Sequence, residues 1–205
     1  MPYPAGHRTA VKEKIIDSAR RLFNRHGFDN VSVSQIMAGA GLTHGGFYSY
    51  FKSKSDLYAE VLDCFFTNPN WKNCWEGIKV DRLSPDVGAQ VVRAYLSRQH
   101  YESVEDSCPM VALPSDVTRS SKTVKRTFET VFQAMVRALE HSMPQNGRSR
   151  HITAQATAAM CVGGMIVARA MADRGLADQL RDDCMAVALQ LGGWNSGVSR
   201  KPHKN

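Results

Sequence analysis

Apolar residues recur every three or four positions along most of the chain, a spacing that predicts helices with one buried face. The first such stretch contains Val11, Ile15, Ala19 and Phe23 and stops at Gly27, since glycine commonly ends helices. The sequence has no run of alternating apolar and polar residues and no internal repeat, the patterns of half-buried strands and of solenoids. It therefore predicts an all-α fold.

Three short helices with clear beginnings are predicted next. Ser32 opens a capping box, Thr43 precedes a second short helix, and Ser53 begins a third, because side-chain oxygens at these positions accept hydrogen bonds from free backbone N–H groups. Gly41 lies between the first two helices, and glycine readily adopts the positive φ of a tight turn. Two short helices joined in this way are typical of a helix-turn-helix.

Longer helices are predicted in the remainder of the chain. An irregular segment from 68 to 85 precedes them, because the Asn-Pro-Asn sequence at 68–70 breaks the apolar spacing. The Cys-Pro pair at 108–109 begins a further short helix, since proline is favoured in a first turn. The long helices are expected at 84–103, 121–141, 152–172 and 176–191.

Composition and charge narrow the class of protein. The 205 residues are 43% hydrophobic and 22% charged, which is typical of globular domains. The net charge of +7 lies at the two ends of the chain, and two basic ends allow contact with a polyanion. The longest nearly apolar run, 158–168, is too short for a bilayer that needs roughly 20 residues. We expect a soluble cytoplasmic protein without a signal peptide or membrane segment.

The cysteines and histidines indicate neither metal nor cofactor. The five cysteines are widely spaced without a C-x-x-C pair, so neither a disulfide framework nor a zinc site is expected. No paired carboxylates, activated nucleophile or phosphate-binding loop emerges, and the sequence therefore predicts a protein that is not an enzyme.

The second short helix carries the most informative chemistry. Its N-terminal end presents Thr43, His44, Gly45, Gly46 and Tyr48, at the place where a recognition helix meets base edges in the major groove. Each glycine within a helix costs about 0.8–1 kcal/mol relative to alanine, which is understandable where the backbone must approach a partner closely. A helical hairpin without a role in DNA binding is compatible with the same pattern.

The run from Gly41 to Lys54, with Leu-Phe at 22–23 and Gly-Phe at 27–28 before it, resembles the N-terminal domain of TetR/AcrR-family transcriptional regulators. The remainder of the chain matches this family only in length and helical architecture. The resemblance implies three DNA-binding helices, a connecting fourth helix, and later helices that form a ligand pocket and a dimer interface. The expected domains are a DNA-binding domain at 1–52, an effector-binding and dimerisation domain at 53–192, and a disordered basic tail at 193–205.

The resemblance also implies roles for single residues. Thr43, His44, Gly45 and Gly46 would begin the recognition helix, Tyr48 and Tyr50 would contact phosphate or base, Lys54 would meet a phosphate, and Ser32 would anchor the DNA backbone. His44 stands where the family most often has lysine. Core packing is the alternative for the tyrosines, and for Tyr50 the two interpretations are equally supported. Arg8 and His7 could reach DNA from a flexible arm or play no part.

The second half of the chain is expected to receive the signal. Residues 150–192 would form the homodimer interface, where small residues such as Gly163 and Gly164 admit a close helix. Aromatic and adaptable side chains on the elements expected to enclose an effector pocket are Phe65, Phe66, Trp71, Trp75, Tyr95, Cys108, Met110, Phe128, Phe132 and Met135.

These expectations describe a homodimeric repressor, associated with the nucleoid, that a small apolar or aromatic effector releases from double-stranded operator DNA. One alternative is a regulator that senses oxidants or electrophiles through Cys108, whose position at a helix start favours the thiolate. The acidic residues at 105–106 act against this effect, because their negative charges disfavour a thiolate at Cys108. The favoured interpretation of Cys108 is nevertheless that of a small apolar plug under the effector pocket. A small helical redox-active enzyme and a DNA-compacting protein are alternatives from other classes.

Overall fold

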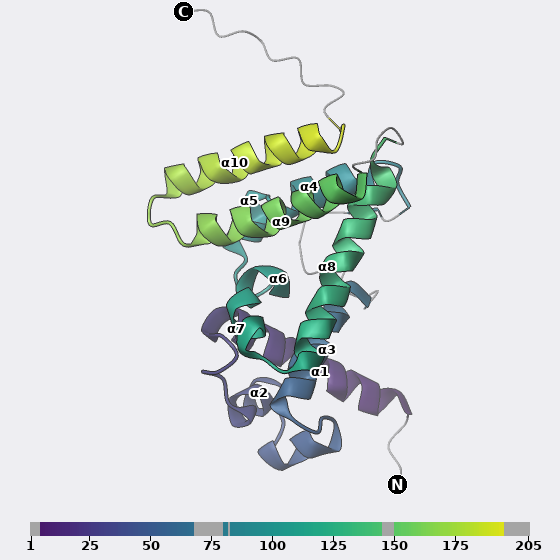
Figure 1. Ribbon diagram of the computed structural model, residues 1–205. Helices are drawn as coiled ribbons and strands as arrows, with labels where there is room; N and C mark the ends of the chain where they lie inside the picture. Colours follow the sequence, from purple (N-terminus) through teal and green to yellow (C-terminus); the bar gives the residue numbers. More distant parts are fainter. Residues whose placement is uncertain (1–4, 68–79, 82, 145–149, 195–205) are drawn as a thin grey trace, which may run out of the picture. The chain divides into compact units, whose positions relative to one another are not determined.

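The computed structural model describes residues 5–67, 80–81, 83–144 and 150–194 (Figure 1). These residues form helices and turns without a strand, so the all-α prediction is confirmed. The helices are α1 (Ala5–His26), α2 (Val33–Gly39), the 3-10 helix η1 (His44–Ser49), α3 (Lys54–Thr67), α4 (Val87–Tyr95), α5 (Arg98–Glu102), α6 (Pro109–Ala112), α7 (Pro114–Arg119), α8 (Lys122–Ser142), α9 (Arg150–Arg169) and α10 (Arg174–Leu191).

The chain forms two compact units, and their boundaries are not at residue 52. Unit 1 is drawn from 1–78 and 98–134, and unit 2 from 79–97 and 135–205. Leu113, Val117 and Val124 lie in the same hydrophobic core as the apolar faces of α1, α2 and α3. Because these residues bury the same apolar surface, packing joins the first helices to α6, α7 and the start of α8. The division at residue 52 stays a prediction about function.

The turns of unit 1 follow the sequence signals. The Ser32 hydroxyl accepts a 3.2 Å hydrogen bond from the Gln35 N–H, and the Gln35 side chain accepts one of 2.8 Å from the Ser32 N–H, which completes the predicted capping box. Gly27 and Gly41 have φ values of +79° and +71°, a region that side chains disfavour. Glycine is therefore required by the backbone at both turns.

Unit 2 is organised around the antiparallel pair of α9 and α10, which both contact α4. The buried Arg181 of α10 donates a 2.8 Å hydrogen bond to the Leu96 carbonyl and pairs with Asp178. Gly164 allows the two long helices to approach, because a Cβ atom there would lie 2.9 Å from the Cys184 sulfur. The prediction that Gly164 faces a second subunit is therefore wrong: it lies within the chain's own packing.

Two further expectations change in unit 2. Trp194 lies in the predicted tail, yet its indole N–H donates a 3.0 Å hydrogen bond to the Ser142 carbonyl; residues 195–205 lie outside the described residues. Helix α9 is long and apolar enough to cross a membrane by length and composition, although its uninterrupted apolar run is short. Its buried residues pack within unit 2, as those of a core helix do.

Candidate nucleic-acid interface

The turn between α2 and η1 builds a helix-turn-helix. Ile36, Met37 and Phe47 are fully buried, and the Leu42 N–H donates a 2.8 Å hydrogen bond to the Met37 carbonyl. These contacts hold η1 against α2 around the positive-φ turn. The element expected to be an α-helix is a 3-10 helix that Thr43 precedes without a side-chain capping bond. The adjacent glycines account for this difference, since they disfavour the α-helix.

The outer face of η1 is open to solvent. Thr43, His44 and Gly45 are exposed, and Tyr48 is 65% exposed. The Tyr48 ring lies edge-on to those of His44 and Phe47, with centroid distances of 6.3 and 5.3 Å. Because so little of Tyr48 is buried, core packing does not explain this residue.

The two glycines of η1 are not required by the fold. A Cβ atom at Gly45 would meet nothing within 4 Å, and one at Gly46 would make an ordinary 3.5 Å contact with Met37. Neither has a positive φ. Their effect is to leave the backbone at the start of η1 open to a partner, which is the arrangement expected where a chain approaches DNA closely.

Helix α1 supports the end of η1 with two cations four residues apart. The Arg8 guanidinium lies 5.9 Å from the centroid of the half-buried Tyr50 ring and donates a 2.9 Å hydrogen bond to the Ser49 carbonyl. Lys12 lies 5.4 Å from the centre of the Phe51 ring. Arg8 therefore belongs to a helix that contacts η1, and the interpretation as a flexible arm is wrong.

Lys54 holds the loop before α2. Its ammonium donates hydrogen bonds of 2.7 Å to the carbonyls of Phe28 and Val31 and lies 4.2 Å from the centre of the Phe28 ring. Burial lowers the pKa of Lys54, while the charges of Asp29 and Asp116 act in the opposite direction. The residue thus has a structural role. Its contact with phosphate stays a prediction, as do those of Ser32, Thr43, His44, Gly45, Gly46, Tyr48 and Tyr50.

The sequence did not reveal a polar cluster that links α1 to the segment between α5 and α6. The Arg20 side chain is only 2% exposed and pairs with Asp17 and Asp106 at 2.7 and 2.8 Å. Asn24 donates hydrogen bonds to the carbonyls of Glu105 and Ser107 at 3.0 and 2.9 Å. Sequence spacing gives no signal of the pairs that α1 makes with residues 105–107, because these partners lie more than 80 residues away.

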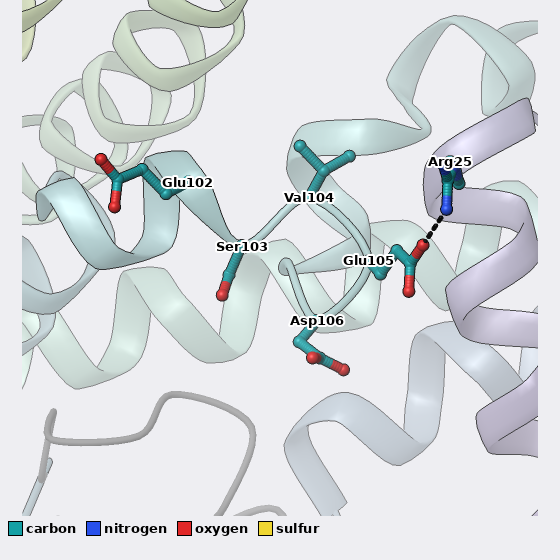
Figure 2. A pocket seen from close by; sticks show the side chains of 6 residues that line it. All are labelled: Arg25, Glu102, Ser103, Val104, Glu105 and Asp106. Carbon is teal, nitrogen blue, oxygen red and sulfur yellow. Dashed lines mark hydrogen bonds and ion pairs between the residues drawn. The ribbon is translucent and has the colours of Figure 1, made fainter.

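Figure 2 shows the surface hollow beside this cluster, where Arg25 pairs with Glu105 at 2.6 Å. The hollow is lined by Arg25 and residues 102–106. Its walls are largely charged, and no group of His, Cys, Asp and Glu that could hold a metal occurs in the described part of the chain.

The residues expected to line an effector pocket are distributed over both units. Cys108 and Met110 are fully buried in unit 1, whereas the buried Tyr95 and Met135 belong to unit 2. The Cys108 N–H donates a 3.2 Å hydrogen bond to the buried His100 ring. Phe128 and Phe132 are half-buried. The side chains of Phe65 and Phe66, and all of Trp71 and Trp75, lie outside the described residues, so the pocket stays a prediction.

Residues 15–61 match the model of bacterial regulatory proteins of the tetR family. The HTH-type transcriptional regulator AcrR of Shigella flexneri is 39% identical over 58 residues, which cover 28% of this chain and 27% of that protein. The HTH-type transcriptional repressor DhaR of Mycobacterium sp. is 31% identical over 61 residues, or 30% of this chain and 31% of its own. The chain therefore spans about a third or less of these relatives.

Solved structures match over most of the chain. The reduced form of NemR from E. coli has a TM-score of 0.68 at 15% identity and covers 88% of this chain and 96% of its own. The complex of SmeT with triclosan has a TM-score of 0.62 at 22% identity and covers 96% and 100%. SmeT is described as the repressor of the multidrug efflux pump SmeDEF of Stenotrophomonas maltophilia. At these identities the likeness establishes the fold.

Proposed function

Since residues 15–61 match the model of bacterial regulatory proteins of the tetR family, we propose that the chain is a homodimeric transcriptional repressor that a small molecule releases from operator DNA. The observation that carries the proposal is the outer face of η1. There Thr43, His44, Gly45 and Tyr48 are exposed, where a recognition helix meets base edges. Acting on DNA, the protein would work in the cytoplasm at the nucleoid.

The exposed face of α9 supports a dimer. Apolar or small residues lie at the spacing of one helix face, and among them Ile152 is 65% and Val167 49% exposed. Gly163 belongs to the same face, and a Cβ atom there would meet nothing within 4 Å. On α10, Leu176, Val187 and Leu191 are between 44% and 51% exposed. Exposed apolar side chains on one helix face commonly mark a protein–protein interface, and a two-fold axis would let the same surface pair with itself.

The proposed mechanism depends on the distance between the two recognition helices of the dimer. Its two recognition helices must lie about one DNA turn apart, roughly 34–36 Å, or a multiple of that distance. An effector that binds better to a dimer with another spacing lowers the operator affinity by the difference between its affinities for the two states. No chemical step is required.

We infer that the effector is a small apolar or aromatic molecule. The buried candidates Tyr95 and Met135 of unit 2 are of the kind that lines such sites, and the similarly folded SmeT binds triclosan. A screen would measure release of labelled operator DNA together with Trp71 or Trp75 fluorescence. Failure of every apolar and aromatic compound would contradict this part of the proposal alone.

The binding experiment separates the proposed function from its alternatives. Fluorescence anisotropy would compare an operator recovered by selection with a shuffled duplex of equal length and composition. A repressor binds the operator more tightly. A DNA-compacting protein binds both duplexes alike, and a redox enzyme binds neither.

A further inference from the structure

Four exposed cations follow one another where α7 ends and α8 begins. Arg119, Lys122, Lys125 and Arg126 are all exposed, and the sequence from 117 to 128 contains no acidic residue. We propose that these four residues, the α7–α8 basic surface, form a second contact with the DNA backbone, outside the helix-turn-helix. The inference rests on the proposed function and extends its binding site to DNA flanking the operator.

The spacing of the cations gives α8 one charged face. Lys122, Lys125 and Arg126 are three and four residues apart, while Val124 and Val131 are buried with 1% and 3% exposure. The apolar side of α8 is therefore occupied by packing, and the cations are directed to solvent. A cluster of lysine and arginine on one face is the electrostatic footprint of a nucleic-acid contact.

A series of contacts connects this surface to the helix-turn-helix within unit 1. One oxygen of Asp116 accepts a 2.8 Å hydrogen bond from the Phe28 N–H, and the other accepts one of 2.8 Å from Arg119. The Phe28 carbonyl in turn accepts the 2.7 Å hydrogen bond of Lys54. Arg119 is therefore separated from the predicted phosphate-binding Lys54 only by Asp116 and the Phe28 backbone.

The fold itself does not explain these cations. The first turn of α8 has no acidic residue, although the positive end of a helix dipole favours anions and disfavours lysine. Arg119 pairs with Asp116, whereas no ion pair of Lys122, Lys125 or Arg126 occurs among residues whose placement is described. An external polyanion would satisfy these charges. DNA phosphates fit because backbone contacts need cations without a defined geometry.

The test compares the wild type with Lys122→Ala/Lys125→Ala on two duplexes. One contains only the selected operator, and the other extends it by ten base pairs on each side. The double variant should bind the long duplex more weakly, with the slope of log K against log salt reduced by about 0.9 for each lost phosphate contact. On the short duplex it should match the wild type. Arg137→Ala is the matched control, an exposed cation three turns further along α8.

Each outcome decides a separate point. An unchanged affinity and salt slope on the long duplex would overturn the inference while leaving operator recognition intact. Equal weakening on both duplexes would contradict a contact with flanking DNA. A wild type that does not distinguish operator from shuffled DNA would refute the proposed function, and the salt slope on the shuffled duplex would still test the basic surface. Because the substituted side chains are exposed, the variants should fold normally, and circular dichroism checks this. Lys122→Gln/Lys125→Gln is a second variant that removes the same two charges.

Discussion

The carboxylate of Asp106 accepts a 2.8 Å hydrogen bond from the Arg20 guanidinium, which lies almost completely buried on α1. Arg20 also donates a 2.8 Å hydrogen bond to the neighbouring Glu105 carbonyl. A buried charge is tolerated when it is paired and hydrogen-bonded. These two residues therefore fix α1, which carries Arg8 to the end of η1, to the segment that precedes α6.

Replacing Arg20 by methionine should destabilise the protein by about 1–3 kcal/mol, since the three hydrogen bonds that the buried guanidinium donates to Asp17, Asp106 and the Glu105 carbonyl are lost. Asp17 and Asp106 are partly exposed, so water can solvate their carboxylates and limit the loss. Urea unfolding measures the change. Asp17→Asn is the control and should cost less, because Asp17 is exposed and the Arg20 guanidinium keeps its hydrogen bonds to Asp106 and the Glu105 carbonyl. Equal losses in the two variants would contradict this description.

Alanine substitutions of Tyr48 and Lys54 should both weaken operator binding but differ in their effect on stability. Tyr48→Ala is expected to weaken operator binding without changing the melting temperature, because the side chain is 65% exposed. Lys54→Ala should weaken binding, reduce the salt slope by about one, and also lower stability, because the carbonyls of Phe28 and Val31 lose their donor. Unchanged affinity in both variants would refute the DNA-binding role.

Substitutions on the exposed face of α9 should disrupt the dimer, whereas substitutions on its buried face should destabilise each subunit. Val167→Asp introduces a charge on the exposed face and should yield folded monomers in sedimentation experiments. Gly164→Leu should instead destabilise each subunit by about 1–3 kcal/mol or more through overpacking, because a side chain there meets Cys184. A monomeric wild type at micromolar concentration would exclude the dimer and with it the spacing mechanism.

Alkaline pH should weaken the fold through Cys161. Burial raises the pKa of its thiol to about 12, and the neighbouring Cys184 acts in the same direction. In the unfolded chain the thiol ionises near its ordinary pKa of 9.0, so above that pH unfolding releases a proton. This contribution to stability is complete below pH 9 and decreases by about 1.4 kcal/mol per pH unit above it, until pH 12.

Urea unfolding between pH 8 and 10.5 checks this slope, with Cys161→Ala as the comparison. The variant starts from a lower stability because it leaves a small cavity, but its stability should decline less steeply with pH. Burial raises the pKa of Cys64 to about 11 as well, and that contribution remains in both proteins. Parallel curves would show that Cys161 does not titrate as described.

Cys108 should resist electrophiles in the folded protein. Its side chain is fully buried, so alkylation measured by mass should be much slower than in the same protein unfolded in urea. Operator affinity should be unchanged after mild treatment of the wild type, and Cys108→Ser should retain binding. Rapid modification of Cys108 that releases DNA from the wild type but not from Cys108→Ser would establish a thiol sensor instead.

Local signals predicted local structure well. The Ser32 capping box, the end of α1 before Gly27 and the positive φ of Gly41 depend on neighbouring residues, and each was predicted from the sequence. The inward position of Gly164 was not, because packing between segments decides it. The 3-10 conformation of η1 was missed as well, although the two adjacent glycines that account for it stand in the sequence. The pair of Arg20 and Asp106 lies 86 residues apart in the chain, a separation at which no periodicity connects two side chains.

Selection of bound sequences from random DNA tests the central claim most directly, with Tyr48→Ala as the paired control. We predict that the wild type enriches a two-fold palindrome, with half-site centres about one helical turn or a multiple apart, and that the variant loses this enrichment. Recovery of no common sequence, or of the same sequence with both proteins, would contradict operator recognition by η1.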